Sequence, residues 1–216
     1  MTFYHYLVDK YGYDEPIFTE DVQEELEMNP NALRQQFKRL KDKGVIEKVK
    51  NGLYFIPQQK PLIGSPTISV NRIIERKFIK RDNNVIGYIK GEKLKNEIND
   101  LSQSSEKVTV VTNNTSSVQR EVMFYETRVI IKKPRVKIAN ENYQLLQSLD
   151  LLTDDGLLSE KPLSEIAGNI KKYLKNFLIT EADLKTYINA YPQKTKLRIY
   201  ESGLYDWFKR RERDYL

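Results

Sequence analysis

Apolar residues near the start of the chain recur at three- and four-residue intervals, with polar breaks between the repeats. From Thr2 to Tyr11 this spacing predicts an amphipathic helix, which Gly12 ends. A short second helix is expected over Glu20–Glu27, with Thr19 at its N-cap and acidic residues in its first turn. Two short helices are therefore expected at the start of the sequence.

A third helix is predicted to run from Pro30 to about Lys43. Asn29 suits the N-cap, proline is favoured at the first helical position, and Gly44 is a typical C′ residue. The buried face of this helix is expected to hold Leu33, Phe37 and Leu40. Only two or three residues join the second and third helices, as in a helix-turn-helix.

Two β-rich runs, VIEKVK at residues 45–50 and LYFIP at residues 53–57, flank Asn51-Gly52. Asn-Gly between such runs is the strongest short hairpin signal, because both residues tolerate the positive φ angles of a type I′ turn. Three helices followed by a two-stranded ribbon is the element order of a winged helix-turn-helix. We therefore predict a DNA-binding domain of this kind over residues 1–57.

The charge of this region is strongly divided. Residues 1–28 hold one basic and eight acidic residues, whereas residues 29–60 hold eight basic and two acidic ones. A small unit with two electrically different faces is oriented by a charged surface. The net charge of the whole chain is +6, which fits a polyanionic partner. Double-stranded DNA is the partner favoured here, although winged helices also serve as protein-interaction modules.

The outward face of the third helix carries side chains of the types that contact DNA. The amino-terminal part of such a helix enters the major groove, where Asn and Gln can bind adenine and Arg can bind guanine. Cations further along the helix and on the ribbon suit phosphates, and such contacts make affinity fall with salt. The predicted DNA-binding residues are Asn31, Arg34, Gln35, Lys38, Arg39, Lys41, Lys48, Lys50 and Asn51.

The remaining residues are expected to form a second domain over 67–216, after a linker with Pro, Gly and Ser at 58–66. The predicted helices cover residues 67–78, 92–101, 140–152, 162–177, 180–191 and 195–213. The predicted strands cover residues 85–89, 108–112, 121–125 and 128–136. The fold class is therefore α+β: an N-terminal winged helix-turn-helix, then a mixed α/β domain with its strands early and its helices late.

A series of short motifs continues from the ribbon into this second domain. NGLYFIP, GSPTISV, VIGYI, VTNN followed by Arg120, and VIIKKPR occur in this order between residues 51 and 135. In this order they resemble the AbiEi-like antitoxins of type IV toxin–antitoxin systems, which provide phage defence by abortive infection. The resemblance covers most of the chain and is weaker beyond residue 135.

The resemblance implies that the two domains have separate tasks. An N-terminal winged helix would act as an autoregulatory transcriptional repressor that binds inverted repeats in double-stranded promoter DNA. The C-terminal antitoxin domain would neutralise a toxin of nucleotidyltransferase fold, with direct contact left open. The DNA-reading surface of the family maps onto Asn31, Arg34, Gln35, Lys38 and the ribbon at Lys48–Lys50.

Basic residues gather on and beside the strand predicted at 128–136. They form either a positive surface for DNA flanks, an acidic toxin cleft or the toxin's RNA substrate, or an edge strand protected by charge against aggregation. Arg120 either pairs with Glu121 or Glu126 or faces a partner. The residues of this possible partner surface are Arg120, Lys132, Lys133, Arg135 and Lys137.

The composition argues against several kinds of catalytic and metal site. The chain has no cysteine and one histidine, His5, which is expected to be a partly exposed helix residue. Gly64-Ser65 resembles the start of a nucleotidyltransferase site, but no closely spaced pair of acids follows it to hold two metals. No phosphate-binding glycine motif occurs, and Asp154-Asp155-Gly156 is interpreted as a turn. We expect no enzymatic activity, no metal and no cofactor.

No stretch of 18 apolar residues occurs, and the first fifteen residues lack the pattern of a signal peptide. A cytoplasmic protein without a membrane partner is therefore expected. Two other functions stay open: a winged-helix transcriptional regulator whose second domain senses a ligand, and a protein-binding adaptor. A neighbouring reading frame that encodes a nucleotidyltransferase would favour the antitoxin over both.

Overall fold

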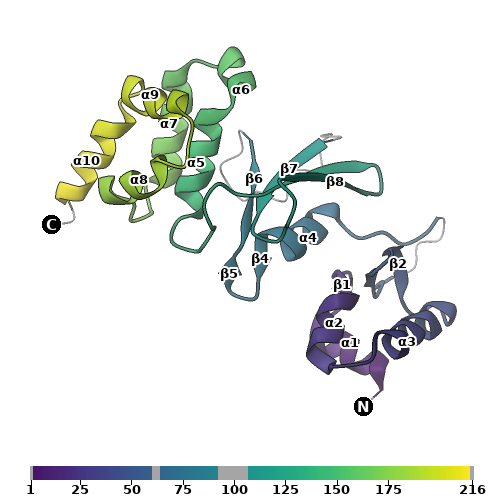
Figure 1. Ribbon diagram of the computed structural model, residues 1–216. Coiled ribbons are helices and arrows are strands. Elements are labelled where there is room, and N and C mark those ends of the chain that lie inside the picture. Colours follow the sequence, from purple (N-terminus) through teal and green to yellow (C-terminus); the bar gives the residue numbers. More distant parts are fainter. Residues whose placement is uncertain (1, 60–63, 92–106, 215–216) are drawn as a thin grey trace. The chain divides into compact units, whose positions relative to one another are not determined.

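The protein is a mixed α+β chain with helices toward both ends and sheets in the middle (Figure 1). The computed structural model describes residues 2–59, 64–91 and 107–214. The chain forms two compact units, Met1–Arg76 with Phe124–Glu126, and Lys77–Met123 with Thr127–Leu216. The division falls beyond the linker predicted at 58–66. The helix predicted over 92–101 lies outside the described residues.

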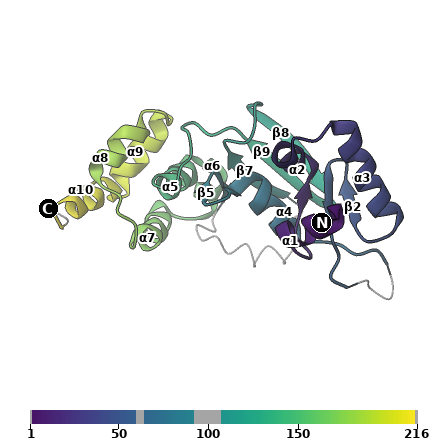
Figure 2. The same cartoon turned by 90° about the horizontal axis from the view of Figure 1, so that it is seen from below.

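Three helices begin the first unit: α1 (Phe3–Tyr11), α2 (Thr19–Leu26) and α3 (Pro30–Asp42), seen from below in Figure 2. Thr2 caps α1 and Asn29 caps α3, each through a side-chain oxygen that accepts a backbone N–H. The predicted N-cap of α2 is wrong, because Phe18 occupies that position and Thr19 is already helical. The Thr19 N–H instead donates to the Gly52 carbonyl oxygen at 3.0 Å.

The first unit also holds a three-stranded sheet of β1 (Ile17–Phe18), β2 (Glu47–Lys50) and β3 (Leu53–Phe55), in the order β1-β3-β2. The hairpin predicted at Asn51-Gly52 joins β2 and β3, but its turn is not type I′. Gly52 has a φ of +79°, whereas Asn51 is not among the described residues with a positive φ. A register shift between Lys48 and Lys50 supplies local twist instead.

The core of the first unit lies between its helices and the hairpin. Phe37 of α3 is fully buried, with the Phe3 ring edge-on at 5.4 Å and the Tyr54 ring stacked at 4.7 Å between centroids. Leu33 is also buried and Leu40 is half-buried against the same cluster, as the spacing along α3 predicts. The other buried members are Leu7, Tyr11, Ile17, Val22, Ile46 and Ile56.

The helix predicted over 67–78 is shorter and irregular. Val70–Ile74 forms α4, and Glu75–Ile79 continues as a π-helix, η1, within which the two units divide. Both precede every strand of the second unit, so the expectation that strands come early in residues 67–216 is wrong. The strands occupy the middle of the chain.

Among the described residues, six strands in two sheets follow: β4 (Lys80–Arg81), β5 (Asn84–Val85), β6 (Gly87–Lys90), β7 (Lys107–Thr112), β8 (Gln119–Phe124) and β9 (Thr127–Lys132). β4 pairs with β5, and the larger sheet has the order β6-β7-β9-β8. β7 and β9 are parallel, whereas β6 is antiparallel to β7. The strand predicted to Val136 ends at Lys132, before Pro134, which has no N–H for a ladder.

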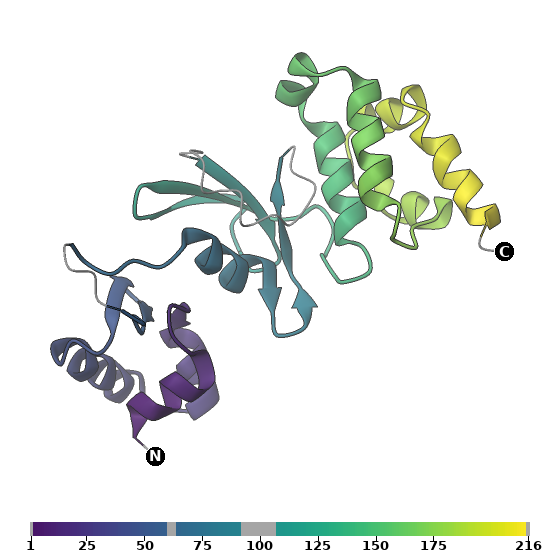
Figure 3. The same cartoon turned by 180° about the vertical axis from the view of Figure 1, so that it is seen from behind.

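Helices complete the second unit: α5 (Tyr143–Thr153), α6 (Asp155–Glu160), α7 (Leu163–Leu174), α8 (Glu181–Ile188), α9 (Gln193–Glu201) and α10 (Leu204–Asp214). α5 contacts β6 and is itself contacted by α7, α8 and α9, while α10 packs on α8 and α9 (Figure 3). The helix predicted over 195–213 is interrupted, because Gly203 takes a φ of +66°.

Side-chain hydrogen bonds cap the start of α6 and the end of α7. Asp154 is the N-cap of α6, so the turn predicted at Asp154-Asp155-Gly156 is wrong. Arg211 of α10 is buried, and its guanidinium donates to the carbonyl oxygens of Leu174 and Lys175 at the end of α7. Phe208 lies in the core beside it, with Tyr205 and Trp207 half-buried against that core.

Candidate nucleic-acid interface

The outer face of α3 is polar and exposed along its whole length. Its apolar residues pack inward, because Leu33 and Phe37 lie one helical turn apart on the opposite side. The only acidic residue of the helix is Asp42, at its end. All six α3 residues predicted to contact DNA are exposed: Asn31, Arg34, Gln35, Lys38, Arg39 and Lys41.

Acidic side chains lie on the other helices of the same unit. The charge division expected from the sequence is thus distributed over different elements, with acids on α1 and α2 and cations on α3. Glu25 is paired locally: Lys10 Nζ lies 2.9 Å from Glu25 Oε1, and this hydrogen bond lowers the pKa of the Glu25 carboxyl. The acidic residues concerned are Asp9, Glu20, Asp21, Glu24 and Glu25.

The inner side of α3 packs against the hairpin. Tyr54 of β3 stacks on Phe37, and burial raises the pKa of the Tyr54 hydroxyl, an effect that the nearby Arg34 guanidinium opposes. Arg34 therefore projects from a helix turn whose inner side is fixed by aromatic packing. A side chain anchored in this way presents its charge at a defined position.

The three predicted hairpin residues differ in their surroundings. Lys48 is exposed, and its Nζ donates to Asn51 Oδ1 at 2.7 Å, so both polar side chains lie at the turn. Lys50 is half-buried, with its Nζ 3.9 Å from the centroid of the Phe124 ring within the same unit. Lys48 and Asn51 are thus presented to solvent, whereas Lys50 already makes a cation–π contact.

The basic stretch of the second unit is not on an edge strand. β9 lies between β7 and β8, which excludes the interpretation of its lysines as protection of a sheet edge. Lys133, Arg135 and Lys137 are exposed beyond the strand, and Lys132 is half-buried at its end. Arg120 lies on β8 with its guanidinium 6.0 Å from the Phe78 ring centroid, while Glu121 pairs instead with Arg128 at 2.6 Å.

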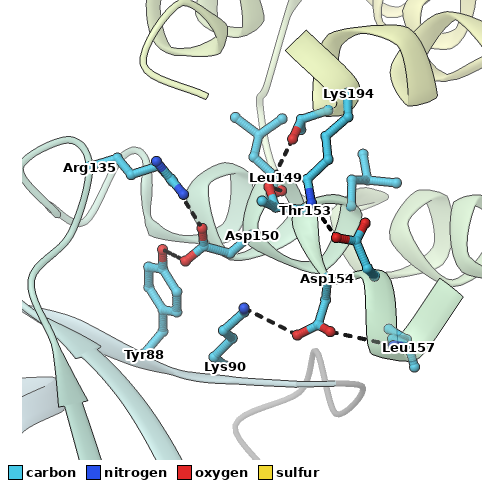
Figure 4. A network of polar contacts seen from close by, with 12 residues as sticks. Tyr88, Lys90, Arg135, Leu149, Asp150, Thr153, Asp154, Leu157 and Lys194 are labelled. Atoms are coloured by element: carbon cyan, nitrogen blue, oxygen red, sulfur yellow. Dashed lines mark hydrogen bonds and ion pairs between the residues drawn. The ribbon is translucent and has the colours of Figure 1, made fainter. Parts of the chain in front are cut away.

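A polar cluster around the buried Asp150 joins this basic stretch to the helices of the second unit (Figure 4). Asp150 of α5 is 9% exposed and accepts a hydrogen bond from the Tyr88 hydroxyl of β6 at 2.9 Å. Arg135 Nε lies 3.9 Å from the other Asp150 oxygen. Close by, Lys90 Nζ lies 3.1 Å from Asp154.

Burial raises the pKa of the Asp150 carboxyl, although the Tyr88 hydrogen bond and the charges of Lys90, Arg135 and Lys132 oppose the shift. Burial also raises the pKa of Tyr88 well above its usual value, and the Asp150 charge adds to this effect. Tyr88 therefore stays protonated and acts as the hydrogen-bond donor to the carboxylate.

The patterns in the sequence did not predict this cluster. Its signal was present in α5, where Asp150 stands within the apolar sequence LLQSLDLL. A single acid on a helix that is otherwise buried all round needs a partner, since an unpaired buried charge is strongly unfavourable. Tyr88 carries no comparable signal, because a tyrosine in a strand is ordinary.

The titration of Asp150 gives a stability prediction. Its folded-state pKa is raised, so its contribution to stability is fully present below about pH 3.9 and is lost as the pH rises through the folded pKa. Asp150→Asn does not titrate. In urea unfolding followed by Trp207 fluorescence, the variant should therefore gain stability relative to the wild type as the pH increases.

Asp155→Asn is the matched control with the opposite sign. Lys194 and Arg198 hydrogen-bond to the Asp155 carboxylate and lower its pKa, so its contribution is present above the unfolded pKa and lost on acidification. This variant should lose stability relative to the wild type as the pH rises. If both variants changed their unfolding free energy in the same direction as the pH rises, the opposite pKa shifts assigned to Asp150 and Asp155 would be wrong.

Comparison with known proteins assigns no family to this chain, because no protein-family model, curated protein or solved structure matches it. Within residues 2–59, 64–91 and 107–214, no group of three or more His, Asp or Glu side chains could hold a metal ion. None of the helices in those ranges is both long and apolar enough to pass through a bilayer.

Proposed function

We propose that the first unit is a winged helix-turn-helix that binds double-stranded DNA. The observation that carries this proposal is the outer face of α3, which is exposed, cationic and amide-bearing, and free of acids before Asp42. In a helix-turn-helix, α3 is the helix that enters the major groove, and the β2–β3 hairpin is the wing. Lys48 and Asn51 at its turn would contact the sugar-phosphate backbone.

The second part of the proposal concerns the biological role. With the resemblance of its motifs to AbiEi-like antitoxins, the chain would repress its own operon from inverted repeats. Its second unit would neutralise a nucleotidyltransferase-fold toxin in the cytoplasm. The chain itself would have no enzymatic activity. Support for this role is the motif order between residues 51 and 135, and the separate compact unit that follows α3 and the hairpin.

A salt-dependent binding titration tests the DNA-binding role. Full-length protein is titrated into labelled DNA from its own promoter region and into a scrambled duplex of equal length and composition. We expect tighter binding to the promoter and a steep decrease of affinity with salt, because each phosphate contact releases counterions. Equal affinity for both duplexes, or no binding at low salt, would make the first unit a protein-interaction module.

Two kinds of substitution separate base contacts from phosphate contacts. Arg34→Ala or Gln35→Ala should cost about 1–3 kcal/mol on the promoter and reduce the preference over scrambled DNA. Lys48→Ala should weaken binding to both duplexes alike and flatten the salt dependence. The same titration measures all three variants. A uniform loss for all of them on both duplexes would rule out readout by α3.

One observation favours a second candidate, a winged-helix regulator whose second unit senses a ligand. The cationic residues around Asp150 belong to that unit, at a distance from α3 in sequence. The two candidates are separated by co-expression with a nucleotidyltransferase-fold toxin, where a neighbouring reading frame encodes one. Protection of growth supports the antitoxin, whereas promoter release by a small anion without protection supports the sensor.

A further inference from the structure

The segment that carries Arg135 is anchored on both sides. At its start, the Lys133 N–H donates to the Val118 carbonyl oxygen at 3.0 Å. At its end, Asn113 exchanges two hydrogen bonds with the backbone of Ile138, at 2.8 and 3.0 Å. Pro134 further restricts the chain between these anchors. Arg135 is therefore held in place by the backbone on either side of it.

The guanidinium of Arg135 is oriented by two groups but is not enclosed by them. Its Nε faces Asp150 Oδ1, and its Cζ lies 5.5 Å from the centroid of the Tyr191 ring. The side chain of Arg135 remains 44% exposed. The structure places no other described partner on its two terminal nitrogens. These nitrogens are the fork that binds two oxygens of one anion.

Lysines from the sheet lie on the same face as this arginine. Tyr88, Val111 and Lys132 stand opposite one another on β6, β7 and β9, so their side chains share one face of the sheet. Tyr88 reaches Asp150 from that face, and Lys90, two residues further along β6, reaches Asp154 from it. Lys132 has no carboxylate within ion-pair distance among the described residues.

The charges around Asp150 do not cancel. Two carboxylates, Asp150 and Asp154, face three cations, Lys90, Lys132 and Arg135. Lys90 is matched by Asp154, which leaves Arg135 and Lys132 against one buried carboxylate whose second oxygen is occupied by Tyr88. An added anion with several oxygens would complete the charge balance and could accept hydrogen bonds from both cations.

We propose that Arg135 and Lys132 form a binding site for a phosphate group in the second unit, with Asp150 and Tyr191 as positioning residues. The chemical class is a phosphate ester or anhydride, whose oxygens match the arginine fork and a lysine point charge. A free nucleotide and the backbone of a single-stranded RNA both present this group. The site does not depend on α3 and is independent of the DNA-binding role.

The test is calorimetric titration of the full-length protein, at low salt, with pyrophosphate, a nucleoside triphosphate and a short single-stranded RNA. Citrate is the non-phosphate control. We expect one pyrophosphate per chain, weakened about tenfold or more by Arg135→Gln, which removes hydrogen bonds to a charged group. Lys172→Gln removes the same charge from an exposed position on α7 and should leave binding unchanged. Tighter binding of the triphosphate or of the RNA identifies the source.

Arg135→Lys provides a second variant in case Arg135→Gln does not fold. It keeps the charge but loses the fork and the contact with Tyr191, so it should weaken pyrophosphate binding several-fold with unchanged thermal unfolding. The proposal is overturned if the wild type binds none of the phosphate probes. Equal losses for Lys172→Gln and Arg135→Gln, or citrate binding as tight as pyrophosphate, would also overturn it.

Discussion

Replacing Phe37 by alanine is expected to lower the free energy of unfolding of the first unit by about 3–5 kcal/mol. The Phe37 ring is fully buried and contacts the rings of Phe3 and Tyr54, so its removal leaves a cavity and deletes two aromatic contacts. The expected consequence is loss of promoter binding, because the inner side of α3 no longer packs on Phe3 and Tyr54. Hydrogen exchange of the α3 amides measures the loss.

The neighbouring residue supplies the control for this prediction. Lys38 is exposed on the same helix, and Lys38→Ala should change the unfolding free energy by no more than about 0.5 kcal/mol. It should nevertheless weaken DNA binding. The fluorescence of Trp207, the single tryptophan of the chain, reports the second unit separately and should be unaffected by either change. Equal exchange protection of α3 in the two variants would contradict the role given to Phe37.

The second large effect is expected at Gly87, the first residue of β6. A Cβ atom at this position would lie 2.0 Å from the Phe78 carbonyl oxygen and 2.7 Å from that of Val111. Both are backbone atoms, so the clash cannot be relieved by turning a side chain. Gly87→Ala should therefore destabilise the second unit by about 3 kcal/mol or more, as overpacking does in a well-packed core. Urea unfolding followed by Trp207 fluorescence measures it.

Gly168→Ala is the matched glycine substitution. Gly168 lies inside α7, and apart from its chain neighbours and the adjoining backbone of α7, an added Cβ would meet no atom within 4 Å. Alanine is the better helix former, so this variant should gain about 0.5–1 kcal/mol in the same assay. If Gly87→Ala stabilised the second unit as Gly168→Ala is expected to do, the close approach of β6 to η1 and β7 would not hold in solution.

Local signals in the sequence were sufficient for most helices and strands. Asn29, Pro30 and Gly44 bound α3 because caps act through the nearest backbone groups, and the apolar period along the helix identifies its buried face. The capping box of Thr180 and Asp183 at the start of α8 is a local contact of the same kind. Local signals failed at Thr19, whose N–H donates a long-range hydrogen bond to the hairpin in place of a cap, and at Gly203, whose left-handed conformation interrupts a continuous apolar pattern.

Strand order and buried polar contacts could not be predicted from patterns in the sequence. The lysines after Ile131 have the same spacing whether β9 is an edge or a central strand, and only its pairing with β7 decides between them. The contact of Arg135 with Asp150 joins residues on different elements, which no periodicity predicts. For α3 the exposed face was predictable, because one helix carries all of its residues.

The position of β8 has a consequence for aggregation. Among the described strands β8 has a neighbour on one side only, so its outer backbone groups could pair with a second copy. When two identical edge strands pair antiparallel in one continuous sheet, each residue lies opposite a residue whose side chain is on the same face of the sheet. Two such registers pair five of the six β8 residues: one places Glu121 against Glu121, and the other places Val122 against Val122 and Arg120 against Phe124. Like charges directly opposite are unfavourable, so Glu121 disfavours the first register, whereas the edge stays open to the second register and to a strand of different sequence.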